Sequence, residues 1–151
     1  HTACRRQRQM CIRDSPHAVG NSFTRMINHI DADYYIAQPE GYELDSRITK
    51  NAKITYNQSE ALENADFVYA KNWASYSNYG QILKTDNEWM LTKEKMKITN
   101  NAKFMHCLPV RRNIIVSDEV LDNKNSLVIQ QANNRTFAAQ SVIKLLIDGI
   151  S

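Results

Sequence analysis

The sequence predicts an α/β fold in which a mostly parallel sheet is covered by helices on both faces. Short runs rich in β-branched and aromatic residues alternate with amphipathic segments along the 151 residues. The links between these segments are short, and strands that alternate with helices form parallel sheets because each helix carries the chain back across the sheet. A chain of this length buries a substantial core, so we predict one domain.

The composition is that of a soluble globular protein. The hydrophobic fraction of 42% and the charged fraction of 23% argue against disorder. No apolar run reaches the roughly 20 residues of a membrane span, so we expect no membrane partner. From residue 16 onward the single cysteine is Cys107, which excludes an internal disulfide there. This cysteine usage is typical of a reducing compartment, and we predict a cytoplasmic protein.

The first 15 residues, HTACRRQRQMCIRDS, differ from the rest. They hold four of the 19 basic residues and one of the 16 acidic residues, which leaves 15 of each beyond them and no net charge to attract nucleic acid. They lack a signal-peptide core, helical periodicity and metal-ligand spacing, and they resemble translated sequencing-adaptor read-through. We predict a non-native or disordered segment over 1–15, and a domain over 16–151. A basic arm that folds on nucleic acid is the alternative.

The first half of the domain predicts two helices and three strands. Asn21 or Ser22 can cap a helix whose apolar residues recur at helical spacing, at Phe23, Met26, Ile27 and Ile30. The other predicted elements are a strand over 33–37 ended by Pro39 and Gly41, a strand over 52–56, a helix opened by Ser59, and a buried strand over 66–70.

The second half continues the alternation. The predicted elements are a loop over 74–90, a helix over 88–97, a strand over 103–108 stopped by Pro109, a short helix after Ser117, a strand over 126–129 and a helix over 134–147. The last helix should turn its apolar residues inward, namely Phe137, Val142, Leu145 and Leu146. The layout is Rossmann-like, and such sheets bind ligands beyond the carboxyl ends of their strands.

Polar residues follow three of the predicted strands. Lys71 ends the run DFVYAK, where an ammonium suits a carboxylate, although lysines at strand ends are more often plain solvated caps. The segment QANNR, residues 131–135, places amides and Arg135 at a helix entrance, where backbone N–H groups favour anions.

The segment HCLPVRR, residues 106–112, combines several polar groups. A Cys–His catalytic pair is not expected, because His106 and Cys107 point to opposite faces of the strand; both can be ordinary buried residues. Pro109 stops the strand ladder, so the carbonyl groups of Cys107 and Leu108 should be free to accept hydrogen bonds. Arg111 and Arg112 offer forks for carboxylates, although adjacent arginines are usually surface charge.

Glycine occurs at four positions, 20, 41, 80 and 149, and none forms a glycine-rich phosphate loop. A dinucleotide fingerprint is therefore absent, which argues against a dehydrogenase. We predict that the protein uses neither a cofactor nor a metal.

The motif HCLPVRRN, with EGYELD and DFVYAKNW before it and ANNR after it, resembles the second, amino-acid-binding domain of the transcarbamylases. The resemblance runs from about Pro16 to the last residue and is closest to the branch that acts on acylated ornithine. It implies two Rossmann-like halves, of which the first binds carbamoyl phosphate, in a homotrimer. It further implies that Lys71 and Arg111 bind the carboxylates of the acylated ornithine, and that Arg135 contacts carbamoyl phosphate. Cys107 and Leu108 would be catalytic through their carbonyls.

The implied reaction moves the carbamoyl group to the δ-amine of N-succinylornithine or N-acetylornithine in arginine biosynthesis. The acetylornithine branch carries a modified lysine where this chain has Ile115, which favours the succinyl type. The first domain is missing, so we expect this fragment alone to be inactive. The alternatives are an ornithine carbamoyltransferase and a stand-alone amino-acid-binding or regulatory module without catalysis.

Overall fold

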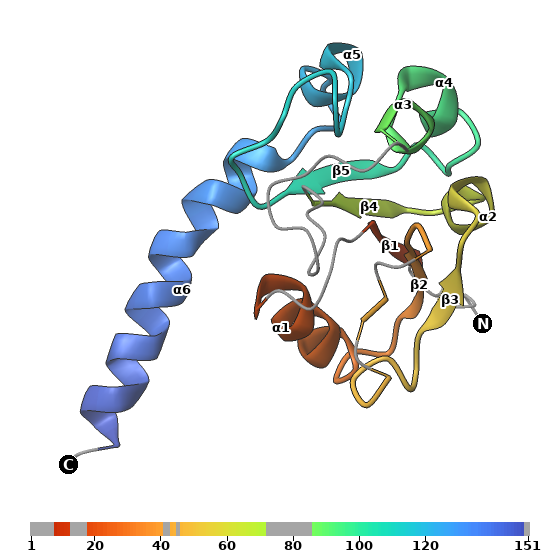
Figure 1. Ribbon diagram of the computed structural model, residues 1–151. Coiled ribbons are helices and arrows are strands. Elements are labelled where there is room, and N and C mark those ends of the chain that lie inside the picture. Colours follow the sequence, from red (N-terminus) through yellow and green to blue (C-terminus); the bar gives the residue numbers. More distant parts are fainter. Residues whose placement is uncertain (1–7, 13–17, 41–42, 45, 72–85, 150–151) are drawn as a thin grey trace, which may run out of the picture.

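The computed structural model describes residues 8–12, 18–40, 43–44, 46–71 and 86–149. In these residues a five-stranded sheet has the order β3-β2-β1-β4-β5, and all its pairings are parallel (Figure 1). The strands are β1 (Arg8–Ile12), β2 (Asp33–Ala37), β3 (Lys53–Thr55), β4 (Phe67–Ala70) and β5 (Lys103–His106). The helices are α1 (Ala18–Ile27), α2 (Gln58–Leu62), α3 (Asp86–Trp89), α4 (Lys93–Met96), α5 (Asp118–Leu121) and α6 (Val128–Asp148). The predicted α/β class is confirmed.

The centre of the sheet is β1, which lies in the segment that we excluded from the fold. It pairs with β2 over five residues and with β4 over four. Placing Arg8–Ile12 outside the fold was therefore wrong. Without this strand the inner edges of β2 and β4 would face each other with unpaired N–H and C=O groups, and a strand between them satisfies both edges. The non-native origin of residues 1–15 stays a prediction.

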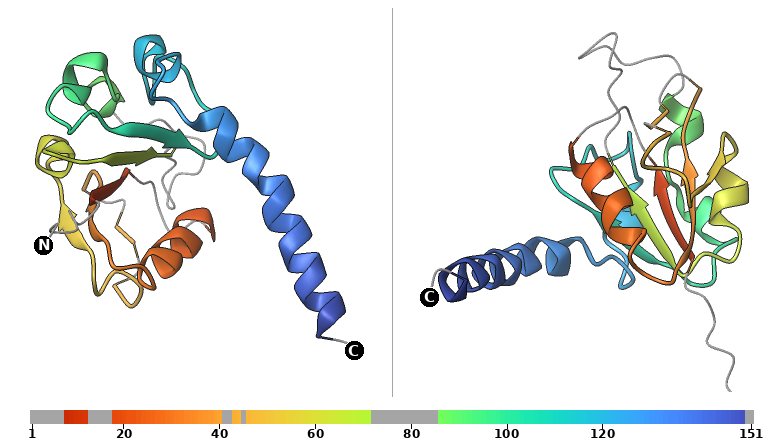
Figure 2. Two further views of the ribbon diagram at one scale, coloured as in Figure 1. Left: turned by 180° about the vertical axis from the view of Figure 1, so that it is seen from behind. Right: turned by 90° about the horizontal axis from the view of Figure 1, so that it is seen from below.

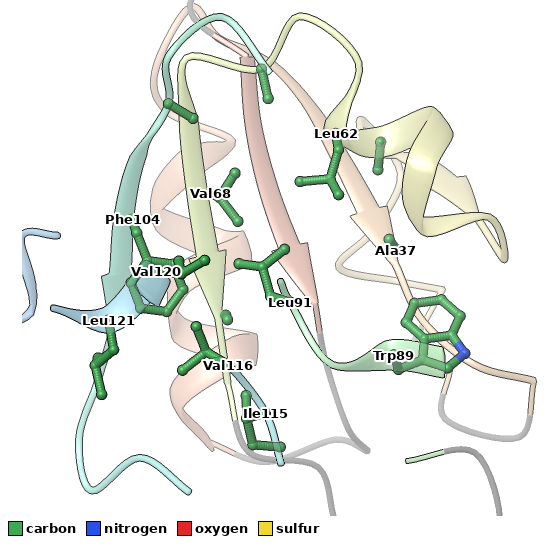
Figure 3. Packing of buried hydrophobic residues seen from close by; sticks show 14 of the residues in the cluster. Ala37, Leu62, Val68, Trp89, Leu91, Phe104, Ile115, Val116, Val120 and Leu121 are labelled. Atoms are coloured by element: carbon green, nitrogen blue, oxygen red, sulfur yellow. The ribbon is translucent and has the colours of Figure 1, made fainter. Parts of the chain in front are cut away.

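One face of the sheet carries the larger part of the core (Figure 3). Val68 and Phe104 of the strands pack there against Leu62 of α2 and Leu121 of α5. Leu91, Ile115 and Val116, which lie between the short helices, complete this cluster and are nearly inaccessible to solvent. The segments 86–96 and 115–121 therefore cover this face of β4 and β5.

The other face of the sheet is covered by α1. Ile27 of α1 packs against Tyr34 and Ile36 of β2. Phe23 stacks on Tyr69 of β4, with ring centroids 4.7 Å apart. Side chains of β4 alternate between the two faces, as expected of a strand buried on both sides. Helices thus lie on both faces of the sheet, as predicted.

Several element boundaries differ from the prediction. α1 begins three residues before Asn21, so Asn21 and Ser22 lie inside it. The cap of α2 is Asn57, whose side chain accepts a hydrogen bond from the N–H of Ser59 at 3.0 Å. The predicted helix over 88–97 is two short helices, α3 and α4. Most of the predicted loop over 74–90 lies outside the described residues.

The predicted strand over 126–129 is wrong. A single bridge joins Ser126 to Phe104, with hydrogen bonds from Phe104 N to Asn125 O and from Leu127 N to Phe104 O. The helix α6 then begins at Val128. The apolar residues that suggested a strand instead form the first turn of a long helix, because each helical residue adds a backbone hydrogen bond once the first turn exists.

The helix α6 leaves the body of the domain, as Figure 2 shows in two directions. Its apolar residues were predicted to point inward, and this was wrong: Phe137, Val142, Leu145 and Leu146 are between 56% and 71% exposed. The described part of the chain offers α6 no surface to pack on beyond its first turns, which contact β5. None of the described helices is long and apolar enough to cross a membrane.

Candidate functional site

The carboxyl ends of β4 and β5 bring the first two predicted site residues together. The strands are parallel and in register, with Ala70 opposite His106 (Figure 1). Lys71 and Cys107 are the first residues after these paired positions, so they leave the sheet side by side. A half-buried lysine therefore lies next to the turn that carries Cys107 and Leu108.

The turn after β5 contains the two carbonyl groups that the sequence analysis singled out, those of Cys107 and Leu108. The strand ends at His106, and the Leu108–Pro109 peptide bond is cis. Leu108 has φ of 36°, in the left-handed region that branched residues seldom adopt. In the described part of the chain, neither Cys107 nor Leu108 accepts, at its carbonyl oxygen, any of the hydrogen bonds found in turns and loops. Both carbonyls can therefore serve a ligand.

His106 supports this turn from inside. Its side chain is 1% exposed, and its Nδ1 accepts a hydrogen bond from the Leu108 N–H at 3.0 Å. Burial, together with the nearby Lys71 charge, lowers the pKa of His106 to about 4. Because Nδ1 already accepts a backbone N–H, it is not available to take the proton of the Cys107 thiol.

The two arginines after the turn have different roles. Arg112 Nε pairs with Asp118 at 2.7 Å, and Arg112 Nη2 also bonds Asp122. These bonds join the loop to α5 and its following residue, so the guanidinium of Arg112 is engaged by two carboxylates. Arg111 lies three residues after Leu108, and its side chain is exposed. The backbone carbonyl of Arg111 accepts a hydrogen bond from the Ile115 N–H at 3.0 Å. Binding of a ligand by Arg111 stays a prediction.

Arg135 does not stand at a helix entrance, as the sequence suggested. Because α6 begins at Val128, Arg135 is exposed and lies seven residues into the helix, about 10 Å along its axis. Its backbone N–H is inside the helical ladder and is not free to bind an anion. Any contact of Arg135 with a ligand must use its guanidinium.

A hollow among the described residues lies away from this edge. It has a volume of about 430 Å³ and is formed by α4, α5 and the start of β5, with Met96, Phe104 and Val120 as its apolar lining. One of its lysines has an acidic neighbour, because Lys97 pairs with Glu94 at 2.6 Å. It is open at the amino end of β5, opposite the Lys71–Leu108 edge. The described residues contain no group of three or more histidine, cysteine or acidic side chains able to hold a metal ion.

The fold and this edge define a class: a Rossmann-like ligand-binding domain with a cation and free backbone carbonyls at the carboxyl ends of adjacent strands. Residues 7–146 match the family described as aspartate/ornithine carbamoyltransferase, Asp/Orn binding domain. The chain belongs to this family.

Individual members of this family that are similar to the chain include carbamoyltransferases of two kinds. The chain is 53% identical over 140 residues to an N-succinylornithine carbamoyltransferase of Bacteroides thetaiotaomicron, covering 91% of this chain and 44% of the relative. It is 32% identical over 136 residues to an ornithine carbamoyltransferase of Thermococcus kodakarensis, covering 80% of this chain and 43% of the relative. The chain thus spans less than half the length of the curated relatives it matches.

Solved structures agree with this assignment. The ornithine carbamoyltransferase of Pyrococcus furiosus superposes with a TM-score of 0.80 at 27% identity, over 91% of this chain and 49% of that chain. An N-acetyl-L-ornithine transcarbamylase superposes with a TM-score of 0.74 at 28% identity, over 86% of this chain and 47% of that chain.

Proposed function

We propose that the chain is the amino-acid-binding half of a carbamoyltransferase that transfers the carbamoyl group of carbamoyl phosphate to the δ-amine of N-succinylornithine, in arginine biosynthesis. The observation that carries the proposal is the register of β4 and β5, which sets Lys71 beside the Cys107–Leu108 turn. The 53% identity to a succinylornithine enzyme supports the substrate class.

The proposed mechanism is mainly positioning. Lys71 and Arg111 bind the carboxylates of the acylated ornithine, which places its δ-amine at the turn. The Leu108 carbonyl accepts a hydrogen bond from the uncharged amine and directs its lone pair at the carbamoyl carbon, while the Cys107 carbonyl accepts from the carbamoyl amino group. The amine attacks the carbamoyl carbon, the bond from that carbon to the phosphate oxygen breaks, and the departing phosphate takes the proton that the amine loses. Holding both reactants in this geometry removes much of the entropic barrier.

Charge at the edge favours an anionic substrate. His106 is uncharged above pH 4 to 5, because its pKa is lowered to about 4, so it adds no positive charge beside Lys71. The ammonium group of Lys71 therefore makes the charge at this part of the edge positive. Arg135, on α6, is proposed to contact the phosphate side of the second substrate, to which the other half of the enzyme contributes.

The acyl group is proposed to be succinyl. Position 115, which carries the modified lysine in the acetylornithine branch, is a buried isoleucine in the core. An N-acetylornithine carbamoyltransferase of Xylella fastidiosa is 29% identical to this chain, compared with 53% for the succinylornithine relative. N-acetylornithine and ornithine remain the alternative substrates.

The test is an assay of the complete gene product with N-succinylornithine, N-acetylornithine and ornithine. We expect the succinylated substrate to be preferred. Lys71→Met should raise its KM about tenfold to a hundredfold, because a hydrogen bond between charged groups is worth about 1.5 to 3 kcal/mol. Lys124→Met, a change of an exposed lysine near the amino end of β5, is the control. Activity on ornithine but not on acylated forms would contradict the proposed subclass.

The assembly and the domain boundaries belong to the same proposal. We propose a cytoplasmic homotrimer for the complete protein and an amino-acid-binding domain that includes β1 and extends to residue 151. The stand-alone module without catalysis is the alternative. Reading the gene upstream of codon 16 separates them: an open frame that encodes a carbamoyl-phosphate-binding domain supports the enzyme, and a start codon there supports the module.

A further inference from the structure

The side chain of His106 is engaged at one nitrogen and not at the other. Nδ1 accepts the Leu108 N–H at 3.0 Å. Nε2 is buried and has no hydrogen-bond partner among the described residues. An acceptor at Nδ1 means that the proton of the uncharged ring is on Nε2, so the ring buries an unpaired N–H donor.

This arrangement is energetically unfavourable at Nε2. A buried donor without a partner costs about 1 to 3 kcal/mol, and a phenylalanine would fill a similar volume without that cost. The benefit of an imidazole at position 106 must therefore lie at Nδ1, in its bond to Leu108.

That bond controls the direction of a carbonyl group. The Leu108 N–H and the Cys107 C=O belong to one planar peptide unit and point in opposite directions from it. When His106 holds the N–H toward the core, the Cys107 carbonyl must point away from His106. The same bond steadies Leu108 at its φ of 36°, a conformation that is costly for a leucine without outside support.

We infer that His106 is a positioning residue: by holding the Leu108 N–H, it directs the Cys107 carbonyl toward the carbamoyl amino group at the strand ends. This inference rests on the proposed function. The residue touches no reacting atom and acts through the peptide plane between Cys107 and Leu108.

The experiment compares His106→Phe and His106→Asn in the complete gene product. Phenylalanine keeps a ring and removes the acceptor, whereas the Oδ1 of asparagine can accept in place of Nδ1. We expect His106→Phe to lower kcat about tenfold to a hundredfold with KM for the acylated ornithine changed less than about threefold, because misdirected groups slow the reaction step more than they weaken binding. His106→Asn should recover kcat to within about fivefold of wild type.

His29 provides a matched control. It is exposed and lies just after α1, outside the proposed site. His29→Phe should leave kcat and KM unchanged. Equal losses in His106→Phe and His106→Asn, or a folded His106→Phe protein with the wild-type kcat, would overturn the inference.

A second measurement does not depend on whether a variant folds. In the ¹⁵N-labelled wild-type protein, a scalar coupling across the hydrogen bond should join His106 Nδ1 to the Leu108 amide nitrogen. A proton on Nδ1, or no such coupling, overturns the inference. If the wild-type enzyme transfers no carbamoyl group to any of the three substrates, the proposed function fails and the positioning role of His106 fails with it. If the wild-type enzyme is active and the His106→Phe variant has the same kcat, the positioning role of His106 is refuted and the proposed function stands.

Discussion

A single buried histidine links stability to pH in this domain. His106 is 1% exposed, and desolvation together with the Lys71 charge lowers its pKa to about 4. In the unfolded chain its pKa should be near the ordinary value of 6.5. Between these two values the unfolded state binds more protons than the folded state, so folding stability rises with pH across this window.

The resulting prediction concerns the free energy of unfolding. As the pH falls from about 7 to about 4, His106 should lower that free energy by on the order of 2 to 3 kcal/mol, and the loss from this group should level off once the pH is well below 4. Urea unfolding of wild type and His106→Asn at a series of pH values measures it. Both proteins contain the same carboxylates, so the difference between their free energies of unfolding at each pH reports the contribution of His106. Parallel pH curves would contradict the prediction.

At the scale of elements, a cap decides where α2 begins. The Asn57 side chain accepts from the Ser59 N–H at 3.0 Å, while the Thr55 hydroxyl accepts from the Asn57 N–H at 3.0 Å. The helix has five residues and holds Leu62 in the core. A helix of this length is not stable by helix propensity alone, so its N-terminal cap and its packing against the core stabilise it.

Removing this cap should have a measurable cost. Asn57→Ala should lower the free energy of unfolding by about 1 kcal/mol, because an orphan N–H of the first turn loses its acceptor. Asn57→Asp keeps the acceptor and places a negative charge at the helix start, so it should stay within about 0.5 kcal/mol of wild type. Thermal or urea unfolding checks both. An alanine variant as stable as the aspartate variant would rule out a stabilising role for the cap.

At the scale of the whole molecule, α6 exposes an apolar face that no described residue covers. Its second half carries apolar residues over a broad arc, and Val142, Ile143, Leu145, Leu146 and Ile147 are each more than half exposed. A contiguous apolar surface on a helix of 21 residues is typical of an interface, and the chain spans less than half of its relatives. In the complete protein this face should be covered.

The 151-residue chain should therefore self-associate. We expect a concentration-dependent increase in mass by sedimentation velocity, and its reduction by the double change Leu145→Gln and Leu146→Gln. Because these side chains are exposed, the double change should alter stability by no more than about 0.5 kcal/mol per site. Lys144→Gln is the control on the polar side of the helix. A wild-type chain that stays monomeric at all concentrations would contradict this prediction.

Much of the fold was predictable because local patterns are set by nearby residues. β2 and β4 were predicted within one residue at either end, and β5 ends at the turn that Pro109 imposes. The segment HCLPVRR was predicted to follow a strand, and it begins at His106, the last residue of β5. The anchoring bond of His106 was missed, although a histidine at a buried position of a strand just before a turn is the signal that could have revealed it.

By itself, the sequence determined the α/β class, most strands and the carbonyl-bearing turn, since period, composition and proline act over a few residues. The tertiary structure alone decided three matters: that Arg8–Ile12 fills the centre of the sheet, that residue 126 makes one bridge and no strand, and that the apolar face of α6 points outward. In each case the outcome depends on which surface is available as a partner. A local pattern shows that a segment can pair or pack, whereas its partner is set by elements distant in the chain.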